Sequence, residues 1–296
     1  MELEGILVPL VTPFAADGSV ALDALEKLAG RVLDDGAAGL VALGTTGEPA
    51  ALSADERSAV TEVCASVCAA RGVPLLVGAG GPGTAAAAGE LAALAARVPG
   101  VAGALVTVPS FVRPGEAGTV AHFRALAGAS PVPLVIYHIP YRTGQALSGA
   151  ALLELAALPN VVGVKYATGG VDQAAVELLA GAPQGFSVLG GDDAVLAPLL
   201  ALGAAGGILA SAHLATARFV ELAGAWRSGD VTRARALGRR LTALAVAAFA
   251  APNPAVVKGV LHAQGLIPTP DVRLPLLPAG PDEVARALEL ANGLDL

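Results

Sequence analysis

Short apolar runs alternate along the chain with longer stretches in which apolar residues recur every three or four positions. The runs are rich in β-branched residues and have the length of buried strands, whereas the longer stretches have the period of helices. Strands are predicted at 5–11, 38–43, 73–77, 103–108, 132–137, 161–165, 186–189 and 206–210. Helices are predicted at 21–35, 53–71, 84–97, 115–129, 148–158, 171–180 and 192–202.

Eight strands that alternate with helices predict an α/β fold, the (β/α)8 or TIM barrel. A doubly wound sheet is the alternative, but no Gly-x-Gly-x-x-Gly pattern opens the first predicted helix. Further helical patterns follow at 215–228, 231–250, 254–264 and 281–292. We therefore expect a barrel domain over residues 1–228 and a C-terminal helical extension over 229–296 that packs on it.

The composition restricts the class of partner. Of the 296 residues, 54% are hydrophobic and only 15% are charged, which predicts a large core of small and aliphatic side chains. The formal net charge is −7, and no run of Lys or Arg forms a basic stripe, so nucleic acid is not an expected partner. A small-molecule ligand is the default expectation.

Neither a membrane span nor a metal site is expected. The uncharged stretch 194–217 raises the alternative of a span in a chain with a mean hydropathy of +0.66, but Pro198 and three glycines divide it. The acidic first residues are unlike a secretory signal, which predicts a cytoplasmic protein. The two cysteines, Cys64 and Cys68, share one face of a predicted helix and are too few to hold a metal.

One predicted strand ends in a lysine. The run 161–165 is apolar and β-branched until Lys165, so a fold that buries the strand on both faces would also bury the amine. A desolvated lysine loses its proton more easily and becomes a nucleophile that forms Schiff bases with carbonyl compounds. The alternative is a lysine that reaches solvent or pairs with a carboxylate, and this run by itself favours the alternative.

Two other predicted strand ends carry polar groups. Tyr137 ends the fifth strand, and the second strand leads into Gly-Thr-Thr-Gly-Glu at 44–48. In a barrel these strand ends meet at one face, where loop amides and hydroxyls can hold a carboxylate and pass protons to a tyrosine. The alternatives are a plain strand-to-helix turn and a tyrosine that belongs to the core.

Three segments resemble the signature motifs of the dihydrodipicolinate synthase/N-acetylneuraminate lyase family. They are Gly-Thr-Thr-Gly-Glu at 44–48, Tyr-His-Ile-Pro-Tyr-Arg-Thr-Gly at 137–144 and Gly-Val-Lys-Tyr-Ala-Thr-Gly at 163–169. The resemblance extends to Gly-Gly-Asp-Asp at 190–193 and to Pro-Asn-Pro at 252–254 with Lys258. It covers nearly the whole chain, and the motifs stand in the family's order on the predicted strands.

The resemblance implies a class I, pyruvate-dependent lyase or synthase. Lys165 would form the Schiff base with pyruvate or another 2-keto acid, and Tyr137 would relay protons. Thr45 and Thr46 would bind the pyruvyl carboxylate and link Tyr137 to solvent, with Thr46 counted among the catalytic residues. Further implied substrate-binding positions are Thr45, Thr46, Gly47, Arg142, Phe111 and Ile208, the last through its backbone carbonyl. The iminium is itself the electron sink, so the chemistry needs no metal or organic cofactor.

Arg142 places the chain nearest the synthase branch, which serves lysine biosynthesis. In that branch the arginine of Tyr-x-x-Pro-x-Arg-Thr-Gly holds the carboxylate of aspartate semialdehyde, a task that suits a guanidinium fork. The alternative role for Arg142 is a structural salt bridge in the loop.

The chain departs from the synthase pattern at four positions. Ser110 and Phe111 stand where synthases carry two adjacent tyrosines, and the second of these enters the neighbouring subunit's site. Phe111 keeps the ring and lacks the hydroxyl, so the family's proton relay is incomplete. His138 and His213 replace asparagines of the family; His138 either titrates near neutrality beside Tyr137 or is a packed loop histidine.

Two other functions remain open. One is an aldolase or dehydratase that keeps the Schiff base but acts on a sugar-derived acid of the 2-keto-3-deoxy type. The other is a barrel that binds a keto acid without catalysis, although a binding protein needs no nucleophilic amine. The resemblance also implies a homo-oligomer, either a dimer or a homotetramer.

Overall fold

The computed structural model describes residues 2–81 and 83–294, and its strands form a closed barrel in chain order. Every strand pairing that is resolved between neighbours is parallel. The strands are β1 (Gly5–Pro9), β2 (Gly39–Ala42), β3 (Leu75–Gly78), β4 (Gly103–Thr107), β5 (Leu134–His138), β6 (Val161–Tyr166), β7 (Ser187–Gly190) and β8 (Gly206–Ile208). The predicted (β/α)8 barrel is confirmed.

The chain divides into two compact units. One comprises Met1–Glu4 and Leu76–Gly207, and the other comprises Gly5–Leu75 and Ile208–Leu296. The predicted boundary between 228 and 229 is a helix junction within the second unit, where Gly229 adopts a left-handed conformation and Asp230 caps the next helix. The division into a barrel domain over 1–228 and an extension over 229–296 stays a prediction.

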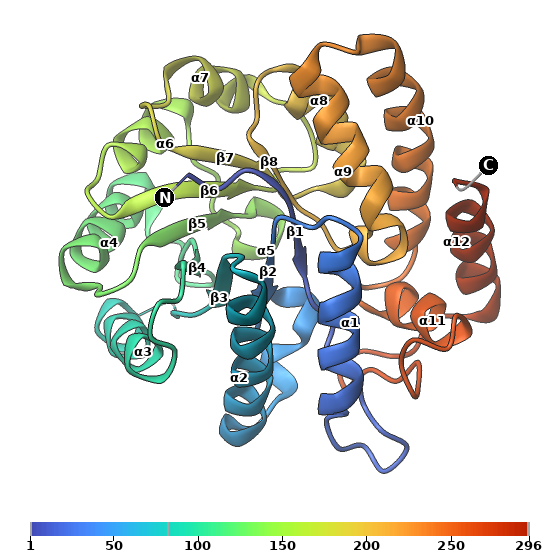
Figure 1. Ribbon diagram of the computed structural model, residues 1–296. Coiled ribbons are helices and arrows are strands. Elements are labelled where there is room, and N and C mark those ends of the chain that lie inside the picture. Colours follow the sequence, from blue (N-terminus) through green and yellow to red (C-terminus); the bar gives the residue numbers. More distant parts are fainter. Residues whose placement is uncertain (1, 82, 295–296) are drawn as a thin grey trace. The chain divides into compact units, whose positions relative to one another are not determined.

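The first unit contains the strands β4, β5, β6 and β7, flanked by helices (Figure 1). The register pairs Tyr137 on β5 with Lys165 on β6, and Lys165 with Leu189 on β7. The helices of this unit are α3 (Thr84–Arg97), α4 (Gly115–Ala129), α5 (Pro140–Thr143), α6 (Gly149–Ala156), α7 (Gln173–Gly181) and α8 (Leu196–Ala201). A 3-10 turn, η3 (Asp193–Val195), precedes α8.

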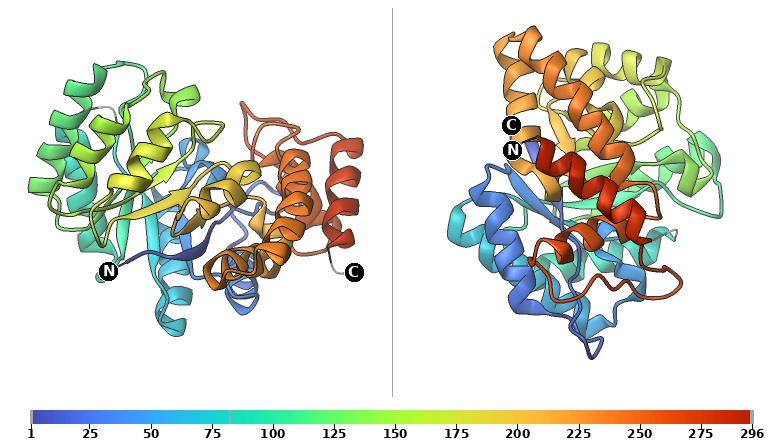
Figure 2. Two further views of the ribbon diagram at one scale, coloured as in Figure 1. Left: turned by 90° about the horizontal axis from the view of Figure 1, so that it is seen from above. Right: turned by 90° about the vertical axis from the view of Figure 1, so that its right-hand side faces the viewer.

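The second unit contains the remaining helices and ends in the C-terminal extension (Figure 2). Its helices are α1 (Leu22–Asp34), α2 (Ala54–Arg71), α9 (Ala212–Ser228), α10 (Val231–Ala248), α11 (Ala255–Ala263) and α12 (Pro281–Gly293). Helix α10 packs against α9 and α12, and α11 packs against α12. The three helices predicted after residue 228 are therefore present and packed together.

Local sequence signals explain where the helices begin and end. Ser53 and Glu56 form a reciprocal capping box at the start of α2, and Gly72 closes its end in a left-handed conformation. Pro140 occupies the first turn of α5, and Gly144 ends it in the same way as Gly72. These caps satisfy backbone groups that a helix end otherwise leaves unpaired.

Several predicted boundaries were wrong for identifiable reasons. Strand β3 begins at Leu75 rather than at residue 73, because Pro74 has no N–H to donate; its carbonyl accepts from Leu40 instead. Helix α9 begins at Ala212 and is kinked at Ala215, where the prediction placed its start. The short helix α5 escaped prediction because four residues are too few to show a helical period.

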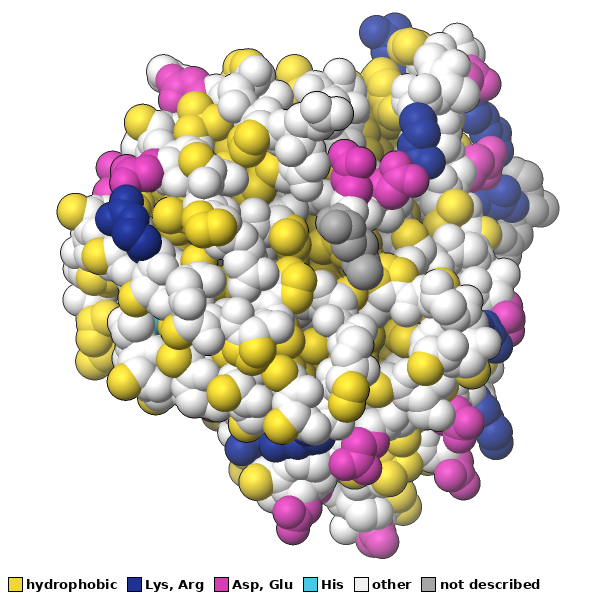
Figure 3. Space-filling model, turned by 60° about the vertical axis from the view of Figure 1, so that its left-hand side comes forward, with side chains coloured by type: hydrophobic (Ala, Val, Ile, Leu, Met, Phe, Trp, Pro, Cys, Tyr) yellow, Lys and Arg dark blue, Asp and Glu magenta, His cyan; other side chains and the backbone are white. Residues whose placement is uncertain are grey.

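No helix of the described residues is long and apolar enough to cross a membrane. Residues 194–217, which raised that question, contribute to α8, β8 and the start of α9. On the face shown in Figure 3, Lys and Arg side chains are few and separated from one another.

Candidate active site

Lys165 and Tyr137 face each other across two neighbouring strands. They are register partners on β6 and β5, and Nζ of Lys165 lies 4.5 Å from the centre of the Tyr137 ring. Both are buried, with 6% of Lys165 and 7% of Tyr137 exposed. The first unit therefore brings together the two residues that the sequence singled out for Schiff-base chemistry and proton relay.

The amine of Lys165 is poised to lose its proton. Burial lowers its pKa from the usual 10.5 to about 8, and the carboxylate of Asp193 is the strongest of the charges that oppose this shift. Arg142 adds a further lowering effect. No carboxylate of the described residues forms an ion pair with Lys165. A substantial fraction of the amine is thus neutral near pH 8, and the neutral amine is the nucleophile.

Gly191 leaves the space that the Lys165 side chain fills. A Cβ atom at Gly191 would lie 2.8 Å from Cγ and 2.9 Å from Cε of Lys165, and 3.0 Å from Cβ of Ala167. Such contacts are too short for a side chain at this position unless Lys165 or its neighbours shift. Gly191 could be placed from the sequence only in the Gly-Gly-Asp-Asp motif, because a close approach between two strand ends leaves no mark in one sequence.

Arg142 belongs to α5, which directly follows β5. Its side chain is exposed and lies over the ring of Tyr141, with 5.7 Å from Cζ to the ring centre. Arg142 forms no ion pair within the part of the chain that the structure describes. The structural salt bridge that was its alternative role is therefore not seen there, and the guanidinium remains available to an anion.

Both histidines of interest are packed, neutral groups. Burial lowers the pKa of His138 to about 4, with a partial offset from Asp172, so titration near neutrality does not apply to it. Its ring lies 5.5 Å from the ring of Tyr166, whose hydroxyl donates to Asp172. His213 has its pKa lowered to about 4 by burial. Of the two alternatives for His138, a packed loop histidine agrees with its burial and its lowered pKa.

The tautomer of His213 follows from its two hydrogen bonds. Nε2 accepts from the backbone N–H of Val11 at 3.2 Å, so Nδ1 carries the proton and donates to the carbonyl of Ala210 at 2.8 Å. The ring thus ties the segment after β1 to the segment after β8 within the second unit.

The loop 44–48 forms a 3-10 turn, η1 (Thr45–Gly47), at the end of β2. Thr46 and Gly47 are buried, and the Thr12 hydroxyl donates to the Gly47 carbonyl at 2.7 Å. A Cβ at Gly47 would lie 3.1 Å from the Leu10 carbonyl oxygen, so the glycine permits this close packing. Thr45, Thr46 and Gly47, the predicted carboxylate-binding residues, accordingly share one ordered turn.

Glu48 closes this turn and carries a buried ion pair. Its carboxylate accepts from Nζ of Lys258 at 2.8 Å and from the backbone N–H of Arg273 at 2.8 Å, and both side chains of the ion pair are at most 1% exposed. Glu48 has a left-handed backbone (φ 54°), a conformation that costs a non-glycine residue roughly 1–2 kcal/mol. The buried partners hold Glu48 in place despite that cost.

An aromatic ring and an amide complete the attachment of the C-terminal extension to this loop. Phe14 has Nζ of Lys258 at 3.9 Å and Cζ of Arg273 at 4.5 Å from its ring centre. The side-chain amide of Asn253 donates to Oγ1 of Thr46 at 3.0 Å. Lys258 and Asn253 appeared in the sequence only as parts of a motif, since nothing local signals a partner more than 200 residues away.

The two remaining predicted positions differ in exposure. Ile208, the last residue of β8, is fully buried. Phe111 is 95% exposed and has a left-handed backbone (φ 68°). The Phe111 ring therefore packs against little of its own chain.

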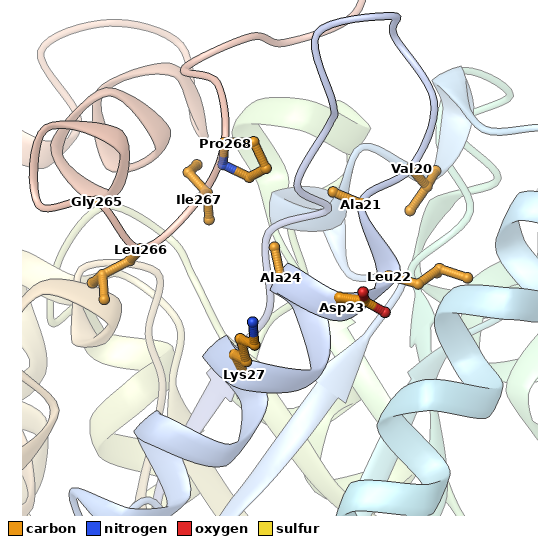
Figure 4. A pocket seen from close by; sticks show the side chains of 10 residues that line it. All are labelled: Val20, Ala21, Leu22, Asp23, Ala24, Lys27, Gly265, Leu266, Ile267 and Pro268. Atoms are coloured by element: carbon orange, nitrogen blue, oxygen red, sulfur yellow. The ribbon is translucent and has the colours of Figure 1, made fainter.

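A pocket of about 680 Å³ lies between the start of α1 and the segment 265–268 (Figure 4). Asp23 and Lys27 are the charged residues of its lining. None of the predicted site residues lines it, so it has no part in the candidate chemistry. Among the described residues no cluster of His, Cys, Asp and Glu could hold a metal ion.

The sequence model of the Dihydrodipicolinate synthetase family matches residues 2–291. The chain belongs to this family. It is 38% identical to the 4-hydroxy-tetrahydrodipicolinate synthase of Neisseria meningitidis serogroup C, over 99% of this chain and 100% of the relative. With the synthase of that name from Moorella thermoacetica it shares 39% identity, over 98% of each chain.

Solved structures of the family share the fold. The dihydrodipicolinate synthase of Thermotoga maritima superposes with a TM-score of 0.93 at 29% identity, and the match covers 99% of each chain. The dihydrodipicolinate synthase of Acinetobacter baumannii, solved in complex with pyruvate, gives a TM-score of 0.91 at 34% identity, over 98% of this chain and 99% of that one. The resemblance drawn from the three sequence motifs is thereby confirmed at the level of the family.

Proposed function

We propose that this family member is a 4-hydroxy-tetrahydrodipicolinate synthase, which condenses pyruvate with aspartate semialdehyde in lysine biosynthesis. The observation that carries the proposal is the buried amine of Lys165, with a pKa of about 8 and no ion-pair partner among the described residues, beside Tyr137. The relatives of that name, at 36–39% identity over nearly the full chain, support it.

The proposed reaction begins at the amine. Nζ of Lys165 attacks the C2 carbonyl of pyruvate, and the carbinolamine loses water to give an iminium. Tyr137 supplies and removes the protons of these steps. The iminium withdraws electrons from the neighbouring methyl group, which loses a proton and leaves an enamine.

The second half of the reaction forms the carbon–carbon bond. The enamine carbon attacks the aldehyde carbon of the acceptor, and the aldehyde oxygen takes up a proton. The acceptor's own amino group then attacks the iminium carbon, closes the ring and expels Lys165 as a free amine. One water leaves during imine formation and no electron donor or acceptor is consumed, so the proposal requires neither a metal nor an organic cofactor.

The carboxylates of the two substrates have separate candidate partners. Thr45, Thr46 and Gly47 offer hydroxyls and amides in one turn to the pyruvyl carboxylate, with the Ile208 carbonyl facing the pyruvyl group. Arg142, exposed and without an ion-pair partner among the described residues, is the candidate for the carboxylate of aspartate semialdehyde.

The exposed Phe111 supports a homo-oligomer, a dimer or a homotetramer, in which this ring enters the site of the partner subunit. We place the enzyme in the cytoplasm, with small molecules and copies of itself as its partners and with no role for nucleic acid or membranes. The catalytic barrel of the proposal spans 1–228, and the extension 229–296 packs on it.

A second candidate function follows from the same ring. Phe111 has no hydroxyl, so it cannot carry a proton between Tyr137 and solvent. An aldolase or dehydratase of a 2-keto-3-deoxy sugar acid, whose substrate brings its own hydroxyls, would be less affected by that loss. A barrel that only binds a keto acid is disfavoured, because a buried lysine without an ion-pair partner is costly unless it is used.

Borohydride reduction in the presence of pyruvate tests the shared chemistry. Peptide mass spectrometry should find the pyruvyl-derived adduct on Lys165, and Lys258, a second buried lysine, is the internal control that should remain unmodified. No adduct, or an adduct elsewhere, overturns the mechanism.

Turnover with different partners tests the acceptor. Pyruvate with aspartate semialdehyde should give the cyclic product, and cleavage of a 2-keto-3-deoxy sugar acid to pyruvate should be slower. A kcat/KM that is higher for the sugar acid would select the second candidate function.

A further inference from the structure

A side-chain amide from the C-terminal extension contacts a hydroxyl that is proposed to bind the pyruvyl carboxylate. Asn253 lies between α10 and α11, 207 residues from Thr46 in sequence, and its Nδ2 donates to Oγ1 of Thr46 at 3.0 Å. Both residues belong to the second unit. Other bonds also join the loop 44–48 to the extension, namely the ion pair of Lys258 with Glu48 and the bond from the backbone N–H of Arg273 to Glu48.

The direction of this hydrogen bond constrains the threonine. An amide nitrogen can only donate, whereas a hydroxyl has one proton to donate and lone pairs with which to accept. When Oγ1 of Thr46 accepts from Asn253, its own proton must point to a different acceptor. The amide therefore prevents the hydroxyl from donating toward Asn253.

The amide itself is held firmly. Asn253 stands five residues before Lys258, whose ammonium is buried against Glu48, two residues after Thr46. The other end of the amide, Oδ1, is buried and has no hydrogen-bond partner among the described residues. A buried oxygen without a partner is unfavourable. An asparagine that served packing alone would not be expected to keep one, which points to the donor end as the useful part.

We propose that Asn253 is a positioning residue that fixes the direction in which the Thr46 hydroxyl donates its proton, toward the carboxylate of a bound pyruvyl group. This rests on the proposed function, in which Thr46 binds that carboxylate. Asn253 acts only through Thr46, and Lys258 holds the segment that carries it.

Two substitutions of Asn253 distinguish loss of its hydrogen bond to Thr46 from reversal of the direction of that bond. Asn253→Ala removes the donor and leaves the Thr46 hydroxyl free to rotate. Asn253→Asp puts a carboxylate there, which can only accept and which draws the Thr46 proton toward itself. We expect kcat/KM for pyruvate to fall about tenfold for Asn253→Ala and about 100-fold for Asn253→Asp, because each change misdirects the hydroxyl that binds the pyruvyl carboxylate.

The exchange of pyruvate methyl protons for deuterium, followed by NMR in D2O, supplies a readout that needs no acceptor. It reports enamine formation alone and should fall in the same order. In a Thr46→Val background neither Asn253 substitution should lower the exchange rate further, because the hydroxyl on which the amide acts is gone.

Asn160 provides a matched control. Its Nδ2 donates to the carbonyls of Ser130 at 3.1 Å and Val132 at 3.0 Å, a purely structural use of the same group. Asn160→Asp should lower the melting temperature and leave kcat/KM for pyruvate within about twofold of the parent.

The outcomes distinguish this inference from the proposed function. If the parent protein forms no borohydride adduct on Lys165, the proposed function fails. If the adduct forms but Asn253→Asp turns over as fast as Asn253→Ala, or if the losses persist in the Thr46→Val background, the assignment of Asn253 is wrong. A drop in melting temperature for Asn253→Asp with kcat/KM for pyruvate unchanged would likewise overturn it.

Discussion

Two lysines of this chain are almost equally buried and differ in nearly everything else. Lys165 is 6% exposed and Lys258 is fully buried, and burial lowers the pKa of each. Lys258 pairs with Glu48 at 2.8 Å, whereas Lys165 faces the carboxylates of Asp192 and Asp193 without forming an ion pair among the described residues. Each lysine has an aromatic ring within 5 Å of its ammonium, at 4.5 and 3.9 Å.

The difference shows that the distance to a carboxylate, more than burial, separates a reactive lysine from a structural one. A contact ion pair holds the proton on Lys258 and makes its amine useless as a nucleophile. More distant carboxylates oppose the effect of burial on Lys165 only in part, so its pKa settles at about 8. Burial destabilises the positive charge of each lysine, and a carboxylate in direct contact determines whether the lysine stays protonated.

The largest expected effect is on catalysis when the reactive lysine is removed. Lys165→Met should abolish imine formation and turnover, by more than about 10³-fold. It should also stabilise the protein at pH 7 by about 1–3 kcal/mol, because a pKa lowered from 10.5 to about 8 means that protonation favours the unfolded chain. Denaturant unfolding measures this gain.

The pH dependence of that gain provides its check. The penalty of the native lysine is fully present below pH 8 and disappears as the pH rises from 8 to 10.5, so the variant's advantage should shrink over the same interval. A variant less stable than the parent at pH 7 would contradict the idea that the native charge is unfavourable.

Removing the other lysine should have the opposite consequence for stability. Lys258→Met leaves the Glu48 carboxylate buried without its partner and should lower the free energy of unfolding by about 3–5 kcal/mol. Addition of Glu48→Gln should restore most of the loss, because the charge is then gone as well. Arg124→Met, which breaks the exposed pair with Glu154, is the control and should cost less than about 1 kcal/mol. Equal losses for the buried and exposed pairs would refute the comparison.

Replacing Arg142 tests how a neighbouring positive charge affects acceptor binding and the pKa of Lys165. Arg142→Ala should lower kcat/KM for the acceptor by about 10²-fold, equivalent to about 2–3 kcal/mol for a charge-assisted hydrogen bond. Because the guanidinium contributes to the lowered pKa of Lys165, that pKa should rise in the variant. Steady-state kinetics in which each substrate is varied in turn measures this effect. Loss of pyruvate binding with unchanged acceptor kinetics would contradict the assignment of Arg142 to the acceptor's carboxylate.

Gly191 tests whether the position of the reactive amine matters as much as its charge. Gly191→Ala places a methyl group against Cγ and Cε of Lys165 and should slow borohydride-trapped imine formation by about tenfold. Gly89→Ala, where nothing lies within 4 Å of the added methyl group, should leave the rate unchanged. A rate for Gly191→Ala equal to that of its control would mean that the side chain moves aside without cost.

The smallest effect is the pH dependence of the parent enzyme. Imine formation with pyruvate requires the neutral amine, so its rate should rise with an apparent pKa of about 8. Between pH 7 and pH 8 the increase should be about fivefold, since the neutral fraction changes from about one tenth to one half. A rate that keeps rising beyond pH 10 would show an amine with an ordinary pKa.

The sequence was informative where the signal is local. Apolar runs and helical periods predicted all eight strands and the helical extension. The β-branched run before Lys165 was compatible with a buried lysine but by itself favoured one that reaches solvent or pairs with a carboxylate, and the lysine is buried. Pro74 shifted the start of β3 by removing a donor, and α5 was too short to show a period. Such errors lie at boundaries, where one hydrogen bond decides the assignment.

Only part of the candidate site could be predicted from the sequence. Lys165, Tyr137 and the turn 45–47 stand out by residue type at strand ends. The partners of Glu48 and Thr46 lie more than 200 residues away, and the space around Gly191 depends on the packing of two strand ends. The neutral state of His138 is set by burial that no neighbouring residue in the sequence signals.

The ion pair of Glu48 with Lys258 also sets an order of events during synthesis. Glu48 leaves the ribosome long before Lys258, because 210 residues separate them, and until then its carboxylate has no buried ammonium to meet. The loop that carries Thr45 and Thr46 therefore cannot reach its final form cotranslationally at the time its own strand is made. The ammonium that supports this loop comes from a segment that is made late, so a nascent or truncated barrel that ends before α11 would lack the buried ion pair beside the proposed pyruvate site.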